Sequence, residues 1–113
     1  IEETMTHIYD LSKIVLNAAL NMPNKTEEVN LNYSDLREQT LINLKKTSEI
    51  LRDTEDLNEF QIIFGDNKIP FWNAINGPIA DAIWHCGQIA SYRRSSGNPI
   101  NSKVNHFMGT VNK

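Results

Sequence analysis

The fold class is decided by the segment Asp81-Ala82-Ile83-Trp84-His85-Cys86-Gly87-Gln88-Ile89. Its apolar residues recur at helical spacing, in a series that begins just before the segment at Ile79. A second, polar stripe recurs at steps of four, three and four residues and consists of Asp81, His85, Gln88 and Tyr92. The segment therefore predicts an amphipathic helix with a carboxylate and an imidazole on one face.

Glycine and proline residues indicate the limits of this helix. Gly77-Pro78 marks either a kink or the true start, because proline is favoured at the first helical position. Gly97 suits the cap that ends a helix, and Pro99 prevents its continuation. We therefore expect a helix over residues 78–95, preceded by a helical turn over residues 70–76.

Two more helices are predicted upstream. The first covers residues 3–21 and ends before Pro23, with an apolar stripe of Ile8, Leu11, Val15, Ala18 and Met22. The second covers residues 35–52 and follows Ser34, a residue type that caps helix N-termini. Its expected buried stripe consists of Leu36, Leu41, Leu44, Ser48 and Leu51.

The remaining segments are shorter and less regular. Residues 60–69 combine β-branched residues with a Gly65-Asp66-Asn67 turn, which indicates a small hairpin or irregular segment. Residues 23–32 are expected to form a polar loop, and residues 98–113 an irregular tail along the helices. The chain thus predicts a single all-α domain over residues 1–113, with three helices, or four if another helix precedes Ile1.

The composition narrows the classes of partner. The net charge is -3 and there is no block of Lys or Arg, which argues against nucleic acid as the main partner. No segment approaches the roughly 18 consecutive apolar residues of a membrane span. The single cysteine excludes an internal disulfide and favours a reducing compartment such as the cytoplasm, while a targeting segment ahead of Ile1 stays compatible with the sequence.

His7 supplies a third polar group for the face that carries Asp81 and His85. It lies near the start of the first predicted helix, on the same broad stripe as Leu11. Imidazole nitrogens and carboxylate oxygens are common ligands of divalent first-row metals, so these three side chains could hold an ion with positions left open. The alternative is an intrahelical hydrogen bond between Asp81 and His85, with His7 as a satisfied histidine at the core edge.

Other polar and reactive side chains are candidates for a further metal ligand, a nucleophile or substrate-binding residues. His106 lies in the tail, either at the surface or as a further metal ligand. Cys86 falls on the apolar stripe, about 100° around the helix from His85, which predicts an inert core position and disfavours a nucleophilic Cys–His pair. Gln88 could orient His85 or contact a substrate. The predicted substrate-binding residues are Gln88, Tyr92 and Trp84.

Two stretches of the chain resemble the DinB-like (DinB/YfiT-like) superfamily of metalloenzymes. One runs from Gly77-Pro78-Ile79-Ala80 through the segment quoted above to Arg93-Arg94-Ser95-Ser96-Gly97-Asn98-Pro99, and it is similar to the last long helix of these proteins. The other is Thr6-His7-Ile8, which is similar to their histidine-bearing second helix. The resemblance covers nearly the whole chain and implies a DinB-like four-helix bundle whose first helix is missing here.

The resemblance also implies a metal and a class of reaction. DinB-like proteins typically bind a divalent metal through three histidines; His7 and His85 match two of these positions, and Asp81 replaces the third. Such a set implies zinc, nickel, iron or manganese. Characterised relatives include thiol-dependent S-transferases, isomerases and hydrolases, and they are often dimers. The resemblance thus implies a metal-dependent enzyme acting on a small molecule, with a low-molecular-weight thiol as a partner and a homodimeric state; the alternative is a non-catalytic binding or stress-response protein with a degenerate metal site.

Overall fold

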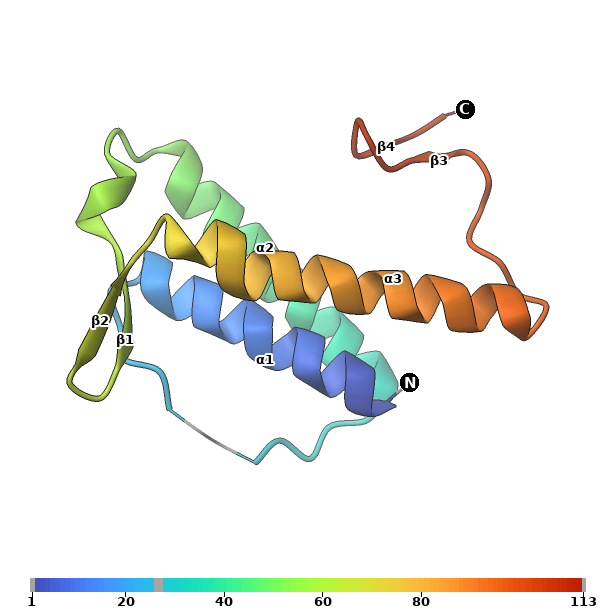
Figure 1. The fold of residues 1–113 in the computed structure, drawn as a ribbon, viewed down its shortest axis with the longest axis horizontal. Helices are drawn as coiled ribbons and strands as arrows, with labels where there is room; N and C mark the ends of the chain where they lie inside the picture. The colour runs from blue at the N-terminus through green and yellow to red at the C-terminus, as the bar shows by residue number, and fades with distance from the viewer. Residues whose placement is uncertain (1, 26–27, 113) are drawn as a thin grey trace.

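The computed structural model describes residues 2–25 and 28–112, and within them it has three α-helices and two small antiparallel sheets (Figure 1). The helices are α1 (Glu2–Ala19), α2 (Tyr33–Arg52) and α3 (Ala80–Ser95), with a 3-10 turn η1 (Leu57–Glu59) and a π-helical turn η2 (Ile75–Ile79). The strands are β1 (Gln61–Phe64), β2 (Asn67–Pro70), β3 (Val104–Asn105) and β4 (Thr110–Val111). No helix in these ranges combines the length and apolar character needed to cross a membrane. Two residues of the predicted loop at 23–32, residues 26 and 27, lie outside the described residues.

The prediction of an all-α four-helix bundle is wrong, because β-structure forms part of the core. Strands β1 and β2 pair antiparallel from Gln61↔Pro70 to Phe64↔Asn67, so the hairpin expected near residues 60–69 is present. Its turn contains Gly65 at φ 56°, a conformation that glycine adopts without strain. Ile62 is only 1% exposed and belongs to the same core cluster as Ala18 and Phe71. The chain is therefore a small mixed fold.

The C-terminal tail forms a second hairpin in place of the irregular segment that was expected. Strands β3 and β4 pair with each other, and the Asn105 side chain accepts a hydrogen bond from the Met108 amide in the connecting turn. Figure 1 shows this hairpin apart from the three helices, so the tail does not follow them. The consequence is visible at Phe107, whose exposed fraction is 96%.

Helix α1 packs against both other helices. Its buried residues include Ile8, Leu11, Val15 and Ala18, as the stripe predicted. The helix ends at Ala19, two residues earlier than expected, and the chain turns at Asn21, which has a φ of 54°. Met22, the last predicted member of the stripe, is consequently half-exposed.

Helix α2 buries only part of the stripe that its leucines predicted: Leu36 is buried as expected and Leu51 is partly buried. Leu41 and Leu44 are exposed, whereas the buried residues are Leu36, Thr40, Asn43 and Thr47. These polar side chains are hydrogen-bonded: Thr40 donates to the Leu36 carbonyl, Thr47 to the Asn43 carbonyl and Asn43 to Ser12 Oγ of α1. Burial therefore costs little, because each donor retains a partner. The helix also begins earlier than expected, with Asn32 and not Ser34 as its N-cap.

Helix α3 continues without a break from η2, so Gly77-Pro78 lies inside a π-helical turn and does not start the helix. None of the residues described for α3 is buried. Its predicted apolar stripe instead lines an apolar groove between the three helices, where Ile83 is 67% exposed. Cys86 is exposed as well, which corrects its expected core position, and so are Trp72 and Trp84.

Candidate metal centre

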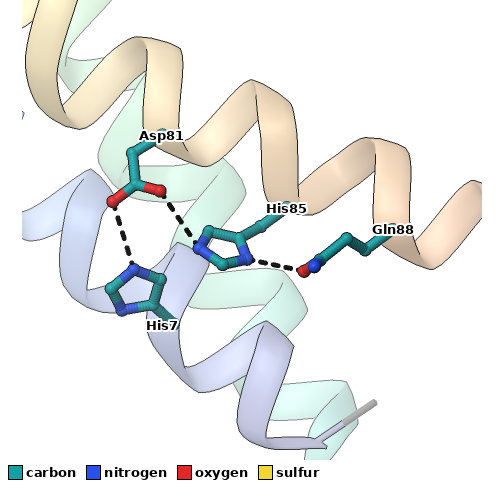
Figure 2. Close-up of polar contacts among 4 residues, drawn as sticks. All are labelled: His7, Asp81, His85 and Gln88. Atoms are coloured by element: carbon teal, nitrogen blue, oxygen red, sulfur yellow. Dashed lines mark hydrogen bonds and ion pairs between the residues drawn. The ribbon is translucent and has the colours of Figure 1, made fainter.

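Helices α1 and α3 lie side by side and run in opposite directions (Figure 1). His7 of α1 thereby faces Asp81 and His85, which lie one turn apart on α3. Figure 2 shows the Asp81 carboxylate directed at both imidazole rings. The fold therefore brings together all three predicted metal ligands, although His7 and Asp81 are 74 positions apart in the sequence.

The contacts within this cluster are short and directional. Asp81 Oδ2 lies 3.3 Å from His7 Nε2, and Asp81 Oδ1 lies 3.1 Å from His85 Nε2. The two rings meet edge to face, with centroids 4.5 Å apart. One ligand-type atom from each residue lies within 4.8 Å of the other two, so the group could hold a metal ion.

The cluster is open to solvent on one side. The side chains of His7 and Asp81 are 46% and 45% exposed, and that of His85 is 18% exposed. Ion pairs at this level of exposure typically contribute only about 0–1 kcal/mol to folding. The contacts of Asp81 with the two histidines therefore add little to the stability of the fold. The exposure of His7 and Asp81 leaves the cluster accessible to a small molecule.

Gln88 fixes the orientation of the His85 ring. Its Oε1 lies 2.8 Å from His85 Nδ1 (Figure 2), and a carboxamide oxygen can only accept a hydrogen bond. His85 Nδ1 therefore carries the proton that it donates to Gln88. The other ring nitrogen, Nε2, is the atom that faces Asp81.

This proton position has an electrostatic consequence for the contact between His85 and Asp81. In a neutral imidazole with its proton on Nδ1, Nε2 presents a lone pair, and here it would face a carboxylate oxygen at 3.1 Å. Two electron-rich atoms at that distance repel each other. A metal ion that binds both atoms would remove the repulsion.

Two of the predicted substrate-binding residues, Trp84 and Gln88, contact His85, and Tyr92 lies seven residues further along α3. The Trp84 ring meets the His85 ring edge-on with centroids 5.0 Å apart, and Trp84 is largely exposed. Gln88 and Tyr92 line a shallow pocket of about 290 Å³ along one face of the helix. His106 lies in the turn between β3 and β4, and Figure 1 shows that hairpin apart from α1 and α3. The structure therefore does not bring His106 to the cluster.

Cys86 has an environment distinct from that of its neighbour His85. It lines the apolar groove between the helices, and burial against that groove raises the pKa of the Cys86 thiol even though the residue is partly open to solvent. A raised pKa leaves less thiolate at neutral pH, which is unfavourable for a nucleophile.

A cleft that the sequence did not predict is lined by Asp81 and lies toward the N-terminal end of α3, away from Gln88. The walls of this cleft come from α1, β1, β2 and the segment before α3, and they include Asn73 and Gly77. The periodicity of a single helix carries no signal for such a site, because the cleft exists only once the hairpin has packed beside α1.

Comparisons with known proteins do not point to a function, so any assignment depends on the geometry of His7, Asp81 and His85. No protein-family model matches the chain, and searches of curated proteins and of solved structures found no match either. The DinB-like resemblance accordingly stays a prediction made from the quoted residues.

Proposed function

We propose that this protein is a divalent-metal-dependent enzyme in which His7, Asp81 and His85 hold the ion. The observation that carries the proposal is the convergence of two imidazole nitrogens on one carboxylate, with contacts of 3.3 Å and 3.1 Å. Three protein ligands leave at least one coordination position free, which is typical of catalytic sites, whereas structural zinc sites are closed by four. The half-exposed side of the cluster gives a small molecule access to that position.

The surroundings of His85 support the same assignment. Metal-binding histidines generally donate their second ring N–H to an oxygen acceptor, and Gln88 Oε1 accepts such a bond from His85 Nδ1. The same bond leaves Nε2 as the nitrogen available for an ion. Imidazole and carboxylate ligands suit zinc, nickel, iron and manganese, which are the metals proposed here.

A divalent ion at this site would lower the pKa of a bound water or thiol and so supply a nucleophile at neutral pH. The chain's own residues bind the ion, orient His85 through Gln88 and leave the cluster accessible from solvent. The resemblance to DinB-like proteins supports thiol-dependent S-transfer to an electrophilic small molecule as the reaction. A low-molecular-weight thiol is then the second substrate.

The metal content of tag-free protein tests the site directly. We expect the full chain to bind one zinc or nickel ion per molecule, and His85→Ala and Asp81→Ala to lose it. His106→Ala is the matched control, because it removes a histidine outside the cluster and should leave the metal content unchanged. Full metal content in His85→Ala would contradict the proposed ligand set.

A non-catalytic protein with a degenerate metal site is the second candidate. It is favoured by the direct contacts of Asp81 with both histidines, because these contacts pair the three side chains with one another without an ion. Parent protein that stays metal-free after reconstitution with zinc and nickel would support this candidate over the enzyme.

A further inference from the structure

A cleft of about 280 Å³ begins at Asp81 and continues toward the β1–β2 hairpin. Its walls are mainly apolar and are formed by Leu11 and Ile14 of α1 and by Ile62, Phe64 and Ile69 of the hairpin. Asn73 contributes an uncharged polar side chain. Because Asp81 also belongs to the metal-ligand cluster, the cleft and the candidate metal centre share a wall.

The charge of the lining residues limits what the cleft can bind. Among the described residues that line it, Asp81 is the only charged one, and none is Lys, Arg or His. An anionic group therefore has no protein cation to pair with in the cleft, and an ion at the cluster is the available partner. The apolar walls suit a hydrocarbon body, whose burial is favourable in proportion to its area.

The other pockets near the cluster are less suited to hold a substrate that also reaches the metal ligands. The apolar groove between the three helices lies along Ile83 and Cys86, and none of the three candidate metal ligands lines it. The pocket beside Gln88 is lined by residues of α3 alone. The cleft at Asp81 is an open hollow lined by residues of several elements, and it shares Asp81 with the cluster, so a molecule bound in it would lie beside the metal ligands.

We propose that this cleft holds the uncharged apolar body of the substrate, while a metal-coordinating head group of the same molecule binds the ion at His7, Asp81 and His85. This inference rests on the metal site proposed above and adds the substrate class. A short alkyl chain or a single small ring suits the apolar walls of this open cleft. A charged body would lie unpaired against those walls, which is unfavourable.

Gly77 offers a way to fill the cleft without replacing a ligand, and it lies one turn before Asp81 along the same helical segment. It lines the cleft, and a Cβ added there would lie 3.4 Å from Asn73 Nδ2, an ordinary contact. A leucine at this position therefore fits the backbone and fills the space intended for the substrate body. Gly87 on α3 is the matched control, because a Cβ added there meets nothing within 4 Å and the residue does not line the cleft.

The test is a titration of the zinc-loaded full chain with acetohydroxamate, butyrohydroxamate and hexanohydroxamate, which share one zinc-binding head. We expect the Kd to fall about two- to fourfold for each added methylene that enters the cleft. Gly77→Leu should abolish this dependence on chain length while keeping zinc and the Kd of acetohydroxamate. Gly87→Leu should behave as the parent does.

The outcomes separate this inference from the proposed function. If the parent binds zinc but its Kd does not depend on chain length, or if Gly77→Leu retains the dependence, the cleft assignment is overturned and the metal site stands. A parent that binds no zinc overturns both. Phe64→Ala is a second variant in case Gly77→Leu does not fold: Phe64 is 41% exposed at the cleft, and its loss should weaken hexanohydroxamate severalfold without affecting acetohydroxamate.

Discussion

Gln88 Oε1 accepts a hydrogen bond from His85 Nδ1 at 2.8 Å, and this contact determines which nitrogen of His85 faces Asp81. The two residues are three positions apart on α3, so the helix itself supplies the geometry. Gln88 is thus a positioning residue for His85. Its effect on metal binding can be measured without knowing the substrate.

Replacing Gln88 with leucine should weaken zinc binding by about 10- to 100-fold, because outer hydrogen bonds to ligating histidines are typically worth that much. Gln88→Glu keeps an oxygen acceptor and should retain zinc affinity or raise it. Competition with a chromogenic chelator measures both Kd values. Gln39→Leu, the same change at an exposed position on α2, is the control. Equal zinc affinity in Gln88→Leu and the parent would show that the His85–Gln88 contact has no part in metal binding.

The sequence predicted the candidate site better than it predicted the packing. Asp81 and His85 are related by helical spacing alone, so their shared face follows from the chain. The residues that α2 buries were predicted only in part: Leu36 is buried as expected, but Leu41 and Leu44 are exposed and the helix buries the polar Thr40 and Asn43. A hydrogen bond from Asn43 to Ser12 of α1 gives one of these buried polar side chains a partner, and no pattern within α2 encodes that contact.

The β1–β2 hairpin was predicted from the sequence, but its burial in the core was not. Its β character was visible in the residues, but a short apolar run does not reveal whether a hairpin is peripheral or part of the core. The 1% exposure of Ile62 places it in the core, and this contact is what turns an expected helical bundle into a mixed fold.

Ile62→Ala should therefore lower the free energy of unfolding by about 2–5 kcal/mol, the usual cost of removing a fully buried aliphatic side chain. Ile63→Ala is the matched control, since successive strand residues point to opposite faces and Ile63 is only partly buried. Denaturant unfolding of both variants gives the comparison. Similar losses for the two would mean that the hairpin does not pack into the core by the Ile62 face.

The buried hydrogen bond between Asn43 Nδ2 and Ser12 Oγ, at 3.1 Å, should contribute measurably to the contact between α1 and α2. Asn43→Ala and Ser12→Ala are each expected to cost about 1–3 kcal/mol, because each change removes a partner from a buried polar group. The double variant should cost less than the sum by about 0.5–1.5 kcal/mol, since the second change removes a group that is already unpaired. Strictly additive losses in urea unfolding would show that the pair is not coupled.

Cys86 should react slowly with iodoacetamide in the folded, metal-free protein. Burial against the apolar groove raises the pKa of its thiol, so at pH 7.5 a smaller fraction is thiolate than in a free cysteine derivative, and the thiolate is the reactive form. The alkylation rate should rise with pH through a midpoint above that of N-acetylcysteine, measured in parallel by mass spectrometry. The same protein in 6 M guanidinium chloride is the internal control, because unfolding exposes the thiol and should return both the midpoint and the rate to the free-cysteine values. A folded protein that already matches N-acetylcysteine at pH 7.5 would contradict the effect of the groove on Cys86 and reopen a nucleophilic role for this residue beside His85.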